Sequence, residues 1–188
     1  MKNFITFIFL CLFSLSALAK GVYQKPSEFV AEAFASAAPA ASLYTYSEDD
    51  IKALGRIQDR QVSAGRTRYW QQGKRTVWVL NHIGKTKPIT AGFIVEDDKI
   101  LRSKVLIFKE TRGWEVRFKY FTDQFIDASI DEQYKLDRRI DNVSGATLSV
   151  RAMQKMARIA LYLHQPVTDN RASIALSPNN DQAQETTP

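Results

Sequence analysis

The middle of the chain alternates between hydrophobic and polar positions, which is the period expected of half-buried strands. Four runs follow this pattern or are mainly apolar, and they are residues 69–72, 76–80, 89–95 and 100–108. Gly73 and Lys74 form a turn between the first two runs, and the polar residues 96–99 separate the last two. We therefore expect three or four antiparallel strands in this region.

Helical periodicity begins before these strands. Ser47 and Asp50 make a capping box, in which a hydroxyl is followed by a carboxylate three residues later. Ile51, Leu54 and Ile57 then recur at the spacing of one helix face. A helix that starts next to Ser47 is therefore predicted.

A longer helix is predicted from residue 147 onwards, because apolar residues recur there three and four positions apart. Its polar face carries Arg151, Lys155 and Arg158, which we expect to face water. The apolar stripe, including two methionines interpreted as core residues, consists of Ala152, Met153, Met156, Ile159, Ala160 and Leu163.

Two less regular segments precede this helix. Residues 113–128 are rich in aromatic side chains and are expected to be helical or looped, and residues 136–140 are expected to form a short extended piece. Together the elements predict an α+β fold, a small antiparallel sheet with helices packed against it.

The first residues have the features of a secretory signal peptide, residues 1–19. A short positive start precedes the apolar run of residues 4–15, and small residues end at Ala19, where we expect cleavage. The run is short for a span, which needs roughly 20 apolar residues. An uncleaved membrane anchor is the alternative, and cleavage predicts a periplasmic or otherwise extracytoplasmic protein.

The remaining chain divides into three expected parts. Residues 20–42 form an Ala-rich N-terminal lead, part of it helical and ending near Pro39. Residues 43–164 form one folded domain. Residues 165–188 are rich in Asn, Gln, Ser, Thr and Pro, and this composition predicts a flexible tail.

Composition excludes several classes of chemistry. Cys11, the only cysteine, lies within the apolar run, so the mature chain would have no disulfide, thiolate nucleophile or iron–sulfur ligand. His82 and His164 lack the spacing of a metal pair, and His82 is interpreted as a polar strand-end residue. The net charge of +6 is compatible with acidic partners or anionic membranes, but no motif points to nucleic acid. We expect neither a metal site nor catalytic side chains.

Four small residues, Ser144, Gly145, Ala146 and Thr147, stand directly at the predicted start of the long helix. The first turn of a helix has free N–H groups and a partial positive charge, so it can hold a phosphate. Gly145 would let the backbone approach a bulky group, Ala146 would keep the surroundings open, and Thr147 would place a hydroxyl beside the anion. The plain alternative is an ordinary helix start, with Ser144 as the cap.

The wider pattern Asp141-x-x-Ser144-Gly145-Ala146-Thr147 resembles the attachment motif of FMN-binding domains. These include the flavin-bearing subunits of the Rnf and sodium-translocating NADH:quinone reductase complexes. The resemblance implies that Thr147 carries FMN through a phosphodiester, and that the other four residues are its recognition frame. It also implies a flavin transferase of the ApbE type, which uses FAD and a divalent metal.

A second segment also resembles this family. Glu110-Thr111-Arg112-Gly113 is similar to the family's E-T-x-G segment, and Trp114 follows it as a candidate wall for the flavin ring. Arg138 or Arg139 could neutralise the flavin phosphate, although a solvated turn is the simpler interpretation. The chain departs from the family pattern in two ways. Asn142 stands where Gly or Ala is frequent, and the expected cleavage would remove the N-terminal helix that complex-bound members of the family keep.

The resemblance implies an electron carrier. An FMN on Thr147 would relay electrons between a membrane-bound donor and an acceptor protein or small oxidant. No G-x-G-x-x-G fingerprint is present for direct use of NAD(P)H. Two alternatives remain, a stand-alone flavin-dependent reductase of a small substrate and a non-flavinylated exported binding domain.

Overall fold

The computed structural model describes residues 21–34 and 37–169 of the 188-residue chain. The expected signal peptide, residues 1–19, and most of the expected tail therefore lie outside the described residues. Within the described part, no helix is both long enough and apolar enough to cross a membrane.

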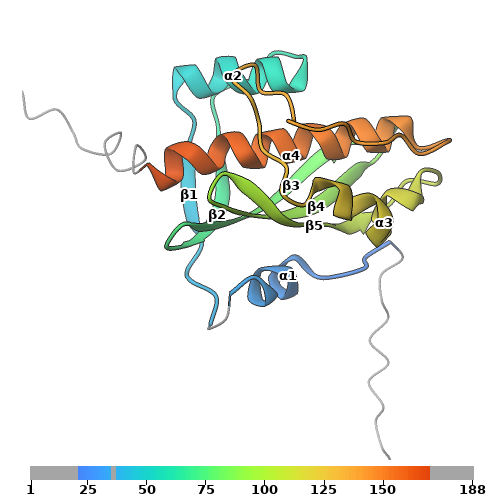
Figure 1. Cartoon of the computed structure of the whole chain (residues 1–188), viewed down its shortest axis with the longest axis horizontal. Coiled ribbons are helices and arrows are strands. Elements are labelled where there is room, and N and C mark those ends of the chain that lie inside the picture. The colour runs from blue at the N-terminus through green and yellow to red at the C-terminus, as the bar shows by residue number, and fades with distance from the viewer. Residues whose placement is uncertain (1–20, 35–36, 170–188) are drawn as a thin grey trace, which may run out of the picture.

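The sheet has five antiparallel strands that follow one another in chain order (Figure 1). They are β1 (Ser42–Thr45), β2 (Arg66–Gln72), β3 (Arg75–Ile83), β4 (Pro88–Glu96) and β5 (Lys99–Phe108). The α+β class and the four strands expected from the hydrophobic pattern are confirmed. β1 was not predicted, because four residues with a single buried side chain give no recognisable period.

The long helix α4 (Thr147–Thr168) crosses one face of the sheet, and α2 (Glu48–Gln58) packs against it. All six residues of the predicted apolar stripe are buried. The core between α4 and the sheet includes Trp78, Phe93, Met153 and Met156, each with a fully buried side chain. The helical pattern thus located the principal cover of the sheet correctly.

The opposite face of the sheet is covered by α1 (Pro26–Glu32), which belongs to the segment expected to be an N-terminal lead. Phe29 is fully buried against it, and the ring would lie 2.4 Å from a Cβ placed on Gly92 in β4. A second apolar cluster joins α1 to Val77, Ile94 and Leu106. The lead is therefore part of the fold, because β3 to β5 have two apolar faces to bury.

Several predicted boundaries differ from the structure. α4 continues four residues past 164, since Val167 is buried and the Thr168 hydroxyl donates to His164 O at 2.9 Å. The helix in the lead ends at Glu32, well before Pro39. The extended piece expected at residues 136–140 is reduced to one isolated bridge, between Ile130 and Leu136.

The aromatic segment is helical and looped, as expected. It contains η1 (Trp114–Arg117), α3 (Lys119–Thr122) and η2 (Asp123–Phe125). Phe121 and Phe125 are fully buried, whereas Trp114 and Phe118 are largely exposed. The segment therefore has a core-facing side and an unusual aromatic outer side.

A buried carboxylate fixes α2 to its neighbours. Asp50 Oδ2 accepts from the Tyr44 hydroxyl at 2.8 Å, from Ser47 N at 2.7 Å and from the Ser47 hydroxyl at 2.8 Å. Asp50 Oδ1 accepts from the Tyr162 hydroxyl at 2.8 Å. Burial and this bond raise the pKa of Tyr162 well above its usual value. The predicted capping box thus also links β1, α2 and α4.

Two of the three cations expected to face water instead hold the end of α2. Lys155 Nζ donates to Gln58 O at 2.6 Å, and Arg158 donates to Ile57 O at 2.8 Å. The last carbonyls of a helix lack partners within it, and these side chains supply them. Of the three, only Arg151 is exposed, as predicted.

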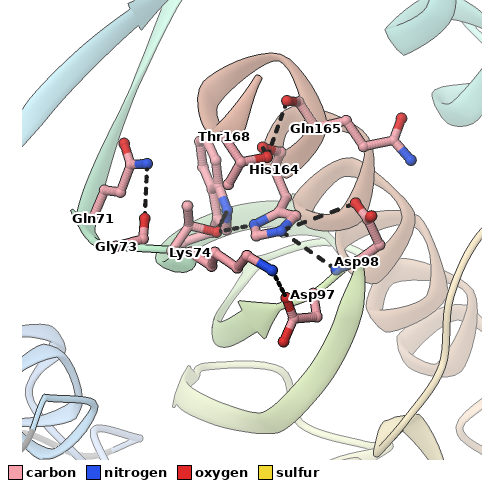
Figure 2. A network of polar contacts seen from close by, with 10 residues as sticks. Gln71, Gly73, Lys74, Asp97, Asp98, His164, Gln165 and Thr168 are labelled. Atoms are coloured by element: carbon pink, nitrogen blue, oxygen red, sulfur yellow. Dashed lines mark hydrogen bonds and ion pairs between the residues drawn. The ribbon is translucent and has the colours of Figure 1, made fainter. Parts of the chain in front are cut away.

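His164 lies at the other end of α4, in a polar network (Figure 2). Its Nδ1 is 2.7 Å from the Thr76 hydroxyl, which also accepts from the Trp78 indole N–H at 2.9 Å. Its Nε2 accepts from the Asp98 backbone N–H at 3.5 Å. Burial lowers the pKa of His164, against the opposing pull of the nearby carboxylates of Asp98, Asp97, Asp169 and Glu96.

We expect this histidine to make stability depend on pH. A folded-state pKa below the unfolded value of about 6.5 gives stability that is fully present above that pH and is lost as the pH falls. Urea unfolding at pH 7, 6 and 5 should show a falling free energy of unfolding, and His164→Gln should flatten the dependence. Burial also lowers the pKa of His82, so the same measurement on His82→Gln shows how much of the pH dependence comes from that histidine. An unchanged slope in His164→Gln would contradict the prediction.

Candidate functional site

The amino-terminal end of α4 is open to a ligand. Thr147 is its first residue, Ala146 is the N-cap, and no described side chain caps the first turn. The alternative in which Ser144 caps the helix is therefore wrong. Unpaired first-turn amides and the helix dipole favour an anion at this position.

The Thr147 hydroxyl is exposed and already oriented. Asn142 Nδ2 donates to Thr147 Oγ1 at 3.0 Å, and Thr147 is exposed to solvent. Asn142 is the position where the chain departs from the family pattern. In this contact Asn142 is the donor, so the Thr147 hydroxyl keeps its own proton for another acceptor.

The residues before Thr147 have different roles. Gly145 has φ of +75°, and no described atom lies within 4 Å of a Cβ placed there, so the space beside it is open as expected. Ser144 is exposed. Ala146 is only 2% exposed and is part of the core, so the expectation that it keeps the surroundings open is wrong.

The structure brings the two predicted motifs together. A Cβ on Gly113 would lie 2.7 Å from Ser149 Oγ and 3.3 Å from Ala146 Cβ, and Gly113 has φ of +79°. Only a residue without a side chain fits this junction without strain. The segment at Glu110–Gly113 therefore supports the start of α4 directly.

Glu110 holds a neighbouring turn. Its carboxylate accepts from the backbone N–H groups of Lys85, Thr86 and Lys87 at 2.6, 2.6 and 2.8 Å, and from the Thr86 hydroxyl at 2.9 Å. Burial acts to raise the pKa of Glu110, but these bonds outweigh it and the net shift is downward. Glu110 thus shapes the β3–β4 turn, while Thr111 is exposed next to it.

The acidic residue of the motif points outward. The Asp141 side chain is 80% exposed and lies 3.9 Å from Arg139 Nε, while its backbone N–H donates to Gln124 Oε1 at 2.7 Å. Arg138 is held by the carbonyls of Ile126 and Asp127 at 2.6 and 2.7 Å. Asp141 is therefore accessible to a modifying enzyme, and Arg138 is a structural residue.

A groove begins beside Thr147 and follows α4. Its first part, about 450 Å³, reaches from Leu148 and Arg151 to Ile83 and His82. A second part of about 320 Å³ shares several of these walls. The shared lining residues are Asp59, His82, Ile83 and Lys155. The groove was not predicted from the sequence, although the exposed side chains of Leu148 and Ile83 mark it in the structure.

The groove carries more positive than negative charge. Arg151, Lys155 and Arg158 line its first part, and Asp59, which pairs with Lys155 at 3.0 Å, is its only carboxylate among the described lining residues. Burial, together with the nearby cations, lowers the pKa of His82. Within residues 21–34 and 37–169, no cluster of three or more His, Cys, Asp or Glu side chains could hold a metal ion.

Comparison with known protein families identifies the segment that contains this site. The family model of the FMN-binding domain matches residues 84–162. This part of the chain is similar to the FMN-binding domain family. The match confirms the family predicted from the Asp141 to Thr147 motif, and it indicates a flavoprotein whose cofactor is FMN. A search among curated proteins found no match to the chain.

Gly145 and Gly113 both have a positive φ but differ in their surroundings, so the same substitution should affect stability differently at the two positions. Gly145→Ala should cost about 1 kcal/mol of stability, because only a positive φ opposes it. Gly113→Ala should cost about 3 kcal/mol, because its Cβ also meets Ser149 and Ala146. Urea unfolding of both variants measures the difference. Equal losses would show that the close approach at Gly113 is relieved by movement.

Proposed function

We propose that this protein is an extracytoplasmic electron carrier with FMN bound covalently to Thr147 through a phosphodiester. The observation that carries the proposal is the exposed Thr147 hydroxyl on the first residue of α4, where no described side chain caps the helix. The family match supports FMN as the cofactor. The covalent bond to Thr147 and the extracytoplasmic location go beyond the family match and are part of the proposal.

The surrounding residues fit such a group. First-turn amides of α4 would hold the phosphate, and Arg151, one turn after Thr147, would add a positive charge on the same side of the helix. The groove beside Leu148 falls within the usual range of cofactor sites, about 300–1,000 Å³. Trp114 begins η1 directly after Gly113, which contacts Ala146 and Ser149, so it flanks the same helix end.

Once attached, FMN supplies the redox chemistry, and the chain positions it. A flavin transferase of the ApbE type would join the Thr147 oxygen to the FMN phosphorus of FAD, with AMP as the leaving group. Asn142 orients that oxygen, and Asp141 is accessible to the transferase. Covalent attachment suits an exported protein, since a flavin lost outside the cytoplasm is not readily replaced.

The partners we propose are a membrane-bound electron donor and an acceptor protein or small oxidant. The apolar run of residues 4–15 motivates an exported, periplasmic location. The positively charged groove favours a second candidate, a stand-alone reductase of a small anionic substrate. Mixing the reduced protein with candidate acceptors, without membranes, separates the two functions.

The deciding experiment is intact mass with peptide mapping after co-expression with a flavin transferase and export. The proposal requires a yellow protein whose mass is raised by FMN less one water, with the addition on the peptide that contains Thr147. A colourless protein with an unmodified Thr147 peptide would contradict the proposal and would favour the alternative, a non-flavinylated exported binding domain.

A further inference from the structure

Four aromatic side chains form a continuous exposed surface next to the proposed attachment site. This aromatic patch consists of Tyr23, Trp114, Phe118 and Tyr120, which are 42%, 42%, 39% and 60% exposed. The Trp114 and Phe118 rings are 5.3 Å apart, and the Phe118 and Tyr120 rings are 5.9 Å apart. Single exposed apolar residues are common, but a contiguous group points to an interaction surface.

Arg117 holds the aromatic patch together. Its guanidinium carbon lies 4.5 Å from the centre of the Tyr23 ring, 4.9 Å from that of Phe118 and 5.2 Å from that of Trp114. Its Nε is buried and has no hydrogen-bond partner among the described residues. One cation thus organises three rings from two distant segments, and the rings are already arranged before any partner binds.

Further cations surround the aromatic patch. Arg112 and Lys119 are exposed on the same segment, and the Lys109 side chain lies beside Gly21. Asp123 pairs with Lys119. The aromatic patch therefore combines Tyr and Trp rings, which have polar tips, with exposed cations on the same segment, and this combination favours an anionic bilayer surface.

The path of the chain places the aromatic patch close to an apolar segment. Gly21 O accepts from Phe108 N at 2.8 Å, and Val22 pairs with Ile107, so the chain enters the fold along the free edge of β5. In Figure 1 the start of the described chain, α3 and the amino-terminal end of α4 lie at the same end of the molecule. Residue 15, the last of the apolar run, is six residues before Gly21, a distance of at most about 20 Å.

We propose that the aromatic patch docks the folded protein on an anionic bilayer surface. While the apolar run is in the membrane, its short connection holds Tyr23 near the bilayer. Docking itself is independent of flavin, but its purpose rests on the proposed function, because Gly113 joins the aromatic patch to the start of α4.

The test uses the exported protein, co-expressed with a flavin transferase, and sedimentation with vesicles of phosphatidylcholine alone or mixed with phosphatidylglycerol. Wild type should bind the mixed vesicles, less tightly as salt is added, and tryptophan emission should shift to the blue as the exposed Trp114 enters the bilayer surface. Phe118→Ser and Tyr120→Ser should each weaken binding about tenfold. Arg112→Gln should weaken it about fivefold.

Leu43→Ser is the matched control, because Leu43 is 54% exposed but lies on β1, at the opposite edge of the sheet. It should bind like wild type. Failure of wild type to bind the mixed vesicles, or equal weakening by Leu43→Ser, would overturn the proposal. Binding only to a purified membrane donor in detergent would show that the aromatic patch recognises a protein instead. Intact mass, measured on the same samples, reports separately on flavin attachment.

Discussion

Thr147→Ala should abolish covalent flavin completely. The substitution removes the one hydroxyl that the structure places on the first residue of α4, exposed and in contact with Asn142. Alanine is a good helix former and the position is exposed, so the fold should be unaffected. The measurement is intact mass and visible absorption after co-expression with a flavin transferase.

Thr147→Ser is the matched control for this result. It keeps the hydroxyl in the same position and should keep the flavin, with the addition found on the serine peptide. If Thr147→Ala retained covalent flavin, the attachment residue would be another one, and Ser144 carries the nearest hydroxyl in the motif. Loss in both variants would show that the methyl group of Thr147 is required for recognition.

Asp50→Ala should destabilise the fold by about 3 kcal/mol. The buried carboxylate accepts from the hydroxyls of Tyr44, Ser47 and Tyr162, and from one backbone N–H. Without it, several of these donors would be buried with no acceptor, which costs more than the loss of the bonds alone. Urea unfolding at pH 7 measures the effect.

The neighbouring Asp49 provides the control. Its side chain is 90% exposed and, among the residues that the structure describes, pairs with Lys52 at 3.1 Å, so Asp49→Ala should change stability by less than about 0.5 kcal/mol. A similar loss in both variants would mean that the negative charge at the start of α2 matters, and the buried hydrogen bonds do not. An unaffected Asp50→Ala protein would show that water replaces the carboxylate.

Local patterns predicted the elements whose signals are local. β2 to β5 alternate or are mainly apolar runs bounded by turn residues, α4 has a period of about 3.6, and the capping box at Ser47 marks the start of α2. The motif from Asp141 to Thr147 located the candidate site because it is contiguous in the chain. Gly113 and Glu110 were placed near it only through family resemblance, and the structure explains their positions by contacts with Ser149 and Thr86.

What the sequence could not predict depends on contacts between distant segments. Nothing near Phe29 shows that its ring fills the space above Gly92. Arg158 follows the polar side of its helix, yet it donates to a carbonyl 101 residues earlier in the chain. Ala146 is part of a small-residue motif, but Gly113 brings core packing next to it. In each case the partner belongs to another element, and periodicity carries no information about it.

The sheet is a simple meander, so each strand pairs with the one made just before it. Such short-range pairing favours rapid folding, and α4, the last element in the described chain, completes the core against the sheet. The end of α4 at Thr147 is in place only when Ala146 packs against Gly113. If Thr147 is the acceptor of FMN, the yellow colour marks chains that have completed maturation, and chains that stall earlier stay colourless.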